Sequence, residues 1–259
     1  MFVTSFFVVH PLGGGEDMAD FIAAEDLSSG EAWRATLAEF IATLLFVFVG
    51  AGAVVATGMV DGGDSLSRLV AIALAHGLTI AILVTATARL SGGHINPAVT
   101  IAAIATRKIG LAKGAMYVGG QLAGAIAGAM LLLAVLPTES QGNLGAHALS
   151  IGTGEGLIVE MMLTFVLVFV IFATAIDPRG PSHLAPFAIG IAVLVDHFVG
   201  VPLTGASMNP ARTLGPALAS GEWANHWVYW VGPIVGGTVA AVLYNVVYIR
   251  GREEEASAA

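Results

Sequence analysis

The sequence predicts an all-α membrane protein with six transmembrane helices, two re-entrant half-helices and an inverted repeat. This prediction rests on the composition, on six long apolar runs, and on a tripeptide that occurs twice. Hydrophobic residues make up 56% of the chain and charged residues 11%, and the mean hydropathy is +0.85. A soluble enzyme with a buried core would instead interrupt its apolar runs with frequent charges.

The six apolar runs are each long enough to cross a bilayer. A spanning helix needs roughly 20 residues to cover about 30 Å at the helical rise. The runs lie near residues 35–56, 68–90, 112–135, 156–176, 184–202 and 226–248.

The placement of basic residues predicts the topology. On one side of the six-span arrangement lie Arg34, Arg89, Arg107, Lys108, Lys113, Arg179, Arg250 and Arg252. The opposite loops carry mainly acids, namely Asp61, Asp64, Glu139, Glu155 and Glu222, with Arg68 at a span edge. Cytoplasmic loops are enriched in Lys and Arg, so both termini are expected in the cytoplasm. We expect an integral multi-pass protein of the cell (plasma) membrane.

The tripeptide Asn-Pro-Ala indicates a helix that begins at membrane depth. Its two copies are Asn96-Pro97-Ala98 and Asn209-Pro210-Ala211, 113 residues apart (209 − 96). Asn is a preferred N-cap, and Pro is preferred at the first helical position, where its missing N–H is not needed. Each copy opens an apolar stretch too short to span, which predicts a half-helix.

The two halves of the chain, about 33–136 and 154–250, form an internal repeat. Glu39 in the first span matches Glu160 in the fourth, and residues 91–98 match residues 204–211. Three spans separate equivalent points, so the second half is inverted relative to the first. Inverted repeats with interrupted helices place the functional site near the midplane, where the half-helices meet.

The two half-helices predict how a pore could pass water and exclude protons. Each helix N-terminus carries a charge of roughly +0.5. If the side-chain oxygens of Asn96 and Asn209 cap their helices, the amide NH₂ groups are left free to face the lumen. A water molecule there would accept hydrogen bonds and point its own hydrogens outward, which breaks a proton wire, while the dipoles oppose cations.

The extended segments before each half-helix, about 91–95 and 204–208, would expose carbonyl oxygens to the passage. Irregular backbone at membrane depth survives where it is buried in protein or lines a wet cavity. Glu39 and Glu160 lie inside spans, where an ionisable residue is costly and is usually functional. Because the two acids match, we interpret them as braces that accept N–H bonds from the loops, in preference to a proton relay.

These features together resemble the aquaporin, or major intrinsic protein, family. The specific segments are 91–100 and 205–212, with two Asn-Pro-Ala copies in register and Arg212 directly after the second. The resemblance covers residues 33–250 as an aquaporin-like channel domain, flanked by cytoplasmic tails at 1–32 and 251–259. It implies a fold of six spans plus two half-helices, and a homotetramer in which each protomer has its own pore.

The resemblance also implies the residues of the narrowest point. By motif spacing, the four filter positions of aquaporins fall on His76, His197, Ala206 and Arg212. Arg212 would supply fixed donors and a charge that repels cations. In some of the plant tonoplast intrinsic branch a loop histidine also reaches the filter, and His147 is the candidate here. His76 and residues 225–233 resemble that branch, whereas His197 stands where it often has Ile.

The resulting function is a passive water channel that excludes protons and ions. Glycerol-conducting relatives typically have Asp after the filter Arg, and this chain has Thr213, so glycerol is not expected. Ammonia remains open because Ala206 leaves room and the histidines can accept its hydrogens. A channel mainly for ammonia, urea or hydrogen peroxide is the alternative reading.

Two further classes compete with a channel. A secondary transporter can also have inverted repeats, but a coupling-ion site usually needs several intramembrane acids, and only Glu39, Glu160 and Asp196 approach that. An enzyme is not expected, because there is no Cys, no nucleophile–base arrangement and no metal-ligand spacing among the histidines. We expect no cofactor, no metal and no nucleic-acid partner; the partners are water, small neutral solutes and the lipid bilayer.

Overall fold

A computed structural model describes residues 18–60 and 65–250. Before the first long helix the chain forms α1 (Met18–Ile22) and a 3-10 turn (Ala24–Ser28), and both contact the third long helix. The remaining parts of the expected tails, together with the loop acids Asp61 and Asp64, lie outside the described residues.

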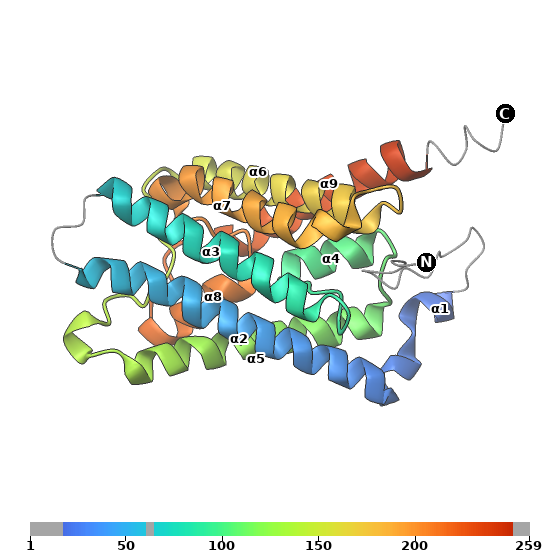
Figure 1. The fold of residues 1–259 in the computed structure, drawn as a ribbon, viewed down its shortest axis with the longest axis horizontal. Coiled ribbons are helices and arrows are strands. Elements are labelled where there is room, and N and C mark those ends of the chain that lie inside the picture. The colour runs from blue at the N-terminus through green and yellow to red at the C-terminus, as the bar shows by residue number, and fades with distance from the viewer. Residues whose placement is uncertain (1–17, 61–64, 251–259) are drawn as a thin grey trace.

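Six of the described helices are long and apolar enough to cross a membrane. They are separated by short loops and by two shorter helices, and Figure 1 shows the six running along a common direction. Their bounds are α2 (Gly30–Met59), α3 (Ser65–Thr87), α5 (Leu111–Val135), α6 (Thr153–Ile171), α7 (Ala185–Thr204) and α9 (Val228–Tyr244). Helices α6 and α9 continue as π-helical turns, Phe172–Ile176 and Asn245–Arg250.

Some boundaries differ from the apolar runs because capping chemistry sets them. Helix α2 begins before its apolar run, where the Ser29 side chain accepts a hydrogen bond from the N–H of Ala32 at 3.3 Å. Helix α3 ends at Thr87, a few residues before the end of its run. The chain turns there because Gly92 and Gly93 have φ of +93° and +67°, a backbone region that favours glycine.

The two predicted half-helices are α4 (Pro97–Ala105) and α8 (Pro210–Ser220). In Figure 1 they lie among the long helices and extend toward opposite ends of the bundle. The described ends of the chain, α1 and the turn Asn245–Arg250, lie at the same end. The all-α fold with six spans and two re-entrant half-helices is therefore confirmed.

The helix packing follows the internal repeat. Helix α2 packs on α5 in the first half, as α6 packs on α9 in the second. The two halves meet where α8 packs on α5, where α4 packs on α9 and, most extensively, where α3 crosses α7. At this crossing a Cβ on Gly77 would lie 2.6 Å from the carbonyl oxygen of Gly190, and a Cβ on Gly190 would lie 2.5 Å from that of Gly77. Glycine is needed at both positions because the backbones touch.

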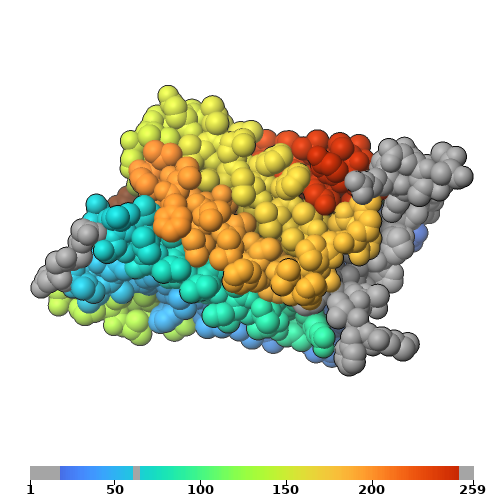
Figure 2. Space-filling model, turned by 45° about the horizontal axis from the view of Figure 1, so that its top comes forward, coloured from blue at the N-terminus to red at the C-terminus, as the bar shows by residue number. Residues whose placement is uncertain are grey.

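Large apolar side chains point outward, as expected for a surface that faces lipid. A stripe with a four-residue period on α2 is exposed, comprising Trp33, Leu37, Ile41, Leu45 and Val49. Figure 2 shows α3, α6 and α7 lying across one such outer face. Most of the buried polar side chains sit instead around the half-helices, so the polar chemistry lies inside the bundle.

Candidate functional site

The two half-helices begin with the same cap. The side-chain oxygen of Asn96 accepts a hydrogen bond from the N–H of Ala98 at 2.8 Å. The side-chain oxygen of Asn209 accepts from the N–H groups of Ala211 at 3.0 Å and of Arg212 at 3.2 Å. Both predicted caps are present, and Pro follows each as the first helical residue.

The amide NH₂ groups of the two Asn residues tie the halves together. Asn96 Nδ2 donates to the carbonyl oxygen of Met208 at 2.8 Å, and Asn209 Nδ2 donates to that of Ile95 at 3.0 Å. The expectation that both NH₂ groups are left free was therefore wrong in part, because the opposite loop takes one hydrogen of each. An amide NH₂ carries two hydrogens, so each Asn keeps a second one for a molecule in the passage.

The residue before each Asn adopts a backbone that few side chains favour. Ile95 has φ of +57° and Met208 has φ of +52°. A β-branched residue in this region is strained, and such strain persists where the surroundings over-determine it. Here the N–H of each of these two residues donates to a glutamate carboxylate, and its carbonyl oxygen accepts from the Asn of the opposite half. These bonds fix the orientation of the loop backbone.

Glu39 provides the carboxylate in the first half. Its Oε1 accepts from Ser91 Oγ at 2.6 Å and from the N–H of His94 at 2.9 Å. Its Oε2 accepts from the N–H of Ile95 at 2.6 Å and from Gln121 Nε2 at 2.8 Å. These are the hydrogen bonds expected of a loop brace.

Glu160 makes the matching contacts in the second half. Its Oε1 accepts from Thr204 Oγ1 at 2.6 Å and from the N–H of Ser207 at 3.0 Å, and its Oε2 accepts from the N–H of Met208 at 2.8 Å. A tyrosine also fixes each loop: Tyr117 donates to the carbonyl of Ser91 at 2.8 Å, and Tyr229 to that of Thr204 at 2.9 Å.

A cavity lies between the two halves and is lined by residues of both. One part of its lining is apolar, and the other is the polar face of the half-helices and their loops. The polar members include both capping Asn residues, and most of the apolar members come from four of the long helices. The lining consists of Phe46, Ile80, Val84, Gly92, Gly93, His94, Asn96, Val99, Leu167, Ile171, Ile189, Val193, His197, Ser207, Met208 and Asn209.

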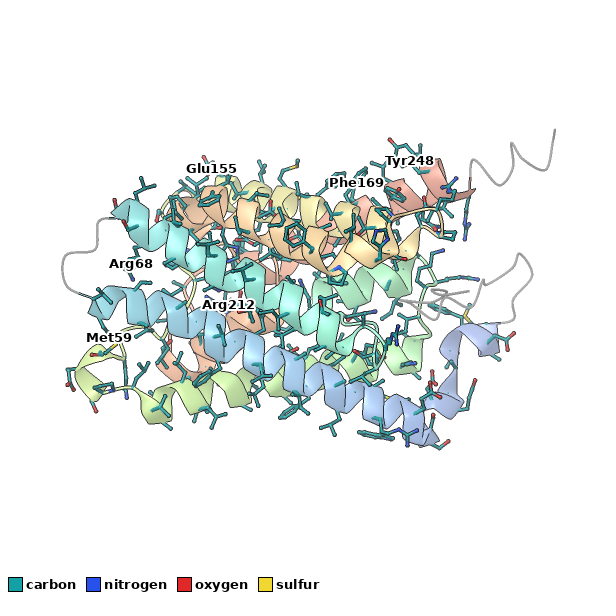
Figure 3. All side chains as sticks on the ribbon, in the orientation of Figure 1. Met59, Arg68, Glu155, Phe169, Arg212 and Tyr248 are labelled. Atoms are coloured by element: carbon teal, nitrogen blue, oxygen red, sulfur yellow. The ribbon has the colours of Figure 1, made fainter. Side chains whose placement is uncertain are left out.

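Three predicted filter residues contact one another, and one of them, His197, lines this cavity. The His76 and His197 rings lie 4.3 Å apart between centroids, and Arg212 Nε donates to His76 Nε2 at 3.3 Å. Figure 3 places Arg212 in the interior of the bundle, and its side chain is 1% exposed. Both imidazoles hold their Nδ1 against a helix carbonyl, that of Ile72 at 2.9 Å and that of Val193 at 2.7 Å.

These carbonyl contacts determine the tautomers. A carbonyl oxygen accepts hydrogen bonds, so Nδ1 carries the hydrogen in both rings and Nε2 presents a lone pair. In His76 that lone pair is taken by Arg212. In His197 the Nε2 atom is buried and has no hydrogen-bond partner among the described residues. His197 lines the cavity and therefore offers an acceptor to a molecule there.

The remaining two predicted residues lie beside this group. Ala206 is buried directly before Ser207 in the second loop and has φ of +60°. His147, from the loop between α5 and α6, places its Nδ1 2.8 Å from Thr213 Oγ1. Burial lowers the pKa of His147 well below its usual value, and the nearby charge of Arg212 lowers it further. The structure thus brings His76, His197 and Arg212 into mutual contact, and Arg212 and Ala206 hold the loop that carries His147.

Sequence reasoning missed several residues that connect the site. Gln121 Nε2 also donates to Thr100 Oγ1 at 3.0 Å, and Thr100 lies 3.0 Å from His94 Nδ1. The available signal was position: Thr100 and Thr213 each lie four residues after the Asn of their half-helix. Among residues 18–60 and 65–250, no cluster of His, Cys, Asp and Glu could hold a metal ion.

The comparisons with known proteins agree with this geometry. Residues 26–244 match the family described as "Major intrinsic protein". The chain belongs to this family. Its relatives include aquaporin TIP4-4 of Zea mays, 48% identical over 83% of this chain and 87% of the relative. Aquaporin-4 of Mus musculus is 45% identical over 83% and 68%, and the probable aquaporin TIP3-2 of Arabidopsis thaliana is 44% identical over 88% and 89%.

A solved structure supports the fold. The aquaglyceroporin from Plasmodium falciparum superposes with a TM-score of 0.76 at 24% identity, over 85% of this chain and 98% of that one. The two TIP relatives agree with the resemblance to the plant tonoplast intrinsic branch. As a member of the major intrinsic protein family, the chain is a multi-pass membrane channel for water or small solutes and not an enzyme.

Proposed function

We propose that this channel conducts water passively and excludes protons and ions. The observation that carries the proposal is the pair of capping Asn residues, whose helices α4 and α8 begin at the same cavity from opposite directions. Each Asn keeps one amide hydrogen beyond the bond to the opposite loop. Two convergent donors orient a passing water through its oxygen, since the neighbouring carbonyl oxygens of Met208 and Ile95 already accept from the Asn amides.

Proton exclusion follows from that orientation. A water that accepts from both Asn residues points its hydrogens away from the midpoint, toward the two ends of the passage. A proton relay needs each water to donate to the next in one direction, so the chain is broken at this water. The positive ends of both half-helices oppose a hydronium or metal cation at the same place.

We propose that the selectivity filter consists of His76, His197, Ala206 and Arg212, with His147 beside it. The buried guanidinium of Arg212 repels cations and supplies donors in a fixed fork. The His197 Nε2 lone pair supplies an acceptor opposite to it. A small neutral molecule that both donates and accepts hydrogen bonds loses little on leaving bulk water here, whereas an ion loses its hydration shell.

Ammonia is a second candidate solute, and the buried His197 Nε2 atom, which has no partner within residues 18–60 and 65–250, favours it. Ammonia carries three N–H groups and one lone pair, so it can donate to His197 and accept from Arg212. The small Ala206 side chain keeps the space beside them open. Replacing His76 by Phe should lower any ammonia flux while water flux persists, because water needs less of the polar ring.

The membrane context is also proposed. The basic residues described on one side, among them Arg107 and Lys113, support cytoplasmic termini by the positive-inside rule. We place the protein in the cell (plasma) membrane as a homotetramer with one pore in each protomer. The outward apolar stripes fit either lipid or a neighbouring protomer.

Stopped-flow shrinkage of proteoliposomes tests the proposal. We expect osmotic water flux well above that of protein-free vesicles, linear in the osmotic gradient and with a low activation energy, without proton flux. Saturating flux would indicate a carrier instead. Ammonia uptake no faster than in protein-free vesicles would remove ammonia as a substrate.

A further inference from the structure

We propose that Thr213 is a positioning residue that seats the loop histidine His147 over the constriction, and that this seat limits the size of the solutes that pass. The inference deepens the proposed function and rests on it. It starts from a loop far from Thr213 in sequence, which enters the site from the connection between the two halves.

Arg212 holds the backbone of this loop. Its Nη1 donates to the carbonyl oxygen of Gly145 at 2.9 Å, two residues before His147. The turn before Gly145 is closed by the Gly145 N–H, which donates to Asn143 Oδ1 at 3.2 Å, and Leu144 within this turn is buried. The loop is therefore packed into the protein beside Arg212 and does not lie loosely on its surface.

The His147 ring enters a socket made by the second half. Gly205 has φ of +86°, and a Cβ there would lie 2.9 Å from His147 Cδ2, so a larger residue would fill the space. The Tyr229 ring lies on another side, 5.2 Å from the His147 ring between centroids and tilted by 33°. These two contacts shape the socket, but neither bonds to a ring nitrogen.

Thr213 supplies the hydrogen bond that fixes the ring. Its Oγ1 lies 2.8 Å from His147 Nδ1 and 2.6 Å from Ser207 Oγ, and Ser207 Oγ accepts from the N–H of Asn209 at 3.2 Å. Hydroxyl groups donate and accept, so this pair can serve either tautomer of the imidazole. The other ring nitrogen, Nε2, is buried without a partner among the described residues. The backbone of Ala206 also lies against the His147 ring, so the ring is held from the side of the second re-entrant loop as well.

The first half contains a matching arrangement that indicates a general role for this threonine. Thr100, the counterpart of Thr213, lies 3.0 Å from His94 Nδ1, and the His94 ring packs edge-on against Tyr117 at 5.4 Å. Each half thus seats one histidine between the threonine of its half-helix and the repeat-related tyrosine. In the first half that histidine belongs to the re-entrant loop, and in the second it comes from outside.

A double-mutant cycle tests whether Thr213 acts through His147. Proteoliposomes of wild type, Thr213→Val, His147→Ala and the double variant are compared for the ratio of urea to water permeability. We expect Thr213→Val and His147→Ala each to raise this ratio about fivefold to tenfold, the factor equivalent to one hydrogen bond of about 1 to 1.5 kcal/mol. The double variant should match His147→Ala alone, and Thr213→Ser should restore the wild-type ratio.

The outcomes separate this inference from the proposed function. Wild-type protein that passes no water overturns the water channel. If the wild type passes water but Thr213→Val still excludes urea, only the role of Thr213 is overturned. The same holds if the effects of the two substitutions add in the double variant. If Thr213→Val is not recovered folded, as judged by size-exclusion chromatography, Thr213→Ala replaces it, because the smaller side chain adds no bulk.

Discussion

The two halves of this channel share one scaffold and differ in the side chains that face the passage. In each half a glutamate accepts a hydroxyl and two backbone N–H bonds from the re-entrant loop. In each, a tyrosine hydroxyl donates to the carbonyl at the start of that loop, and an Asn caps the half-helix. The bracing distances agree within 0.2 Å between the halves. The largest difference is between the bond from the Ile95 N–H, at 2.6 Å, and that from the Met208 N–H, at 2.8 Å.

The divergence lies at the third residue of each half-helix and in the side chains that the neighbouring loops add. Val99 in the first half stands where Arg212 stands in the second. His94 lines the cavity where the second half has Ser207, and His147 joins the second half from a different loop. The comparison shows that the repeated contacts build the scaffold, while the unrepeated side chains give the two halves different polar groups.

The largest expected effect comes from breaking the shared scaffold. Glu160→Gln and Glu39→Gln each replace an accepting oxygen by an NH₂ group that opposes a buried N–H. Leaving one or two buried donors unpaired should cost about 2 to 4 kcal/mol of the free energy of unfolding. Denaturation in mixed micelles, followed by tryptophan fluorescence, measures this, and water flux should fall with it.

The two brace variants should be destabilised to a similar extent, because the geometry repeats. A large loss in one half and none in the other would mean that the repeated contacts do not carry equal weight.

The next effect comes from making the second half resemble the first. Arg212→Val removes the charge and the bonds to His76 and Gly145, each a hydrogen bond from a charged donor worth about 1.5 to 3 kcal/mol. We expect urea flux to rise about tenfold to hundredfold relative to water and proton flux to become measurable. Vesicle swelling assays with a pH-sensitive dye measure both.

Arg212→Lys is the matched control, since it keeps the charge but not the planar fork. This variant should still exclude protons, and its urea flux should lie between those of the wild type and Arg212→Val. If Arg212→Val still excludes protons, the electrostatic role of Arg212 is refuted.

A smaller effect is expected from the tyrosine pair. Tyr117→Phe and Tyr229→Phe each delete one hydroxyl that donates to a loop carbonyl, at 2.8 and 2.9 Å. A neutral hydrogen bond contributes about 1 kcal/mol, so both variants should lose about that much stability and retain most water flux. Unequal losses beyond about 1 kcal/mol would show that the hydroxyl contacts are not equivalent.

The smallest expected effect is that of pH on the outer mouth. Burial and Arg212 lower the pKa of His147, so its imidazole stays neutral as the pH falls through its usual value of about 6.5. Water permeability should therefore be flat from about pH 8 to pH 6. The unfolded chain takes up this proton at higher pH than the folded one, so acidification should lower the free energy of unfolding. At sufficiently low pH the His147 ring should then leave its position beside Thr213.

His147→Gln, which cannot titrate in this range, provides the comparison. A permeability step near pH 6.5 in the wild type that is absent from this variant would show an exposed histidine instead of a seated one.

The scaffold could be predicted from the sequence because its signals are local and repeated. Asn and Pro before a short apolar run predict a capped helix, and two copies in register with Glu39 and Glu160 predict an inverted repeat. The bonds from each Asn to the opposite loop could not be predicted, because they depend on how closely the halves approach. For the same reason the sequence did not indicate that Gln121 connects Glu39 to Thr100.

The filter could be predicted less completely. His76, His197 and Arg212 were found by motif spacing, and they do lie together. The seat of His147 was missed because its partners, Gly205, Thr213 and Tyr229, come from three segments with no common pattern. Contacts between unrepeated segments leave no periodic signal in a single sequence.

The most direct test of this account is an experimental structure in a bilayer at a resolution that shows ordered water. We predict a single file of waters through the cavity, with one oxygen within hydrogen-bond distance of both Asn96 Nδ2 and Asn209 Nδ2. A dry gap between the two Asn residues, or a water file that passes elsewhere, would contradict the claim that α4 and α8 converge on one aqueous passage.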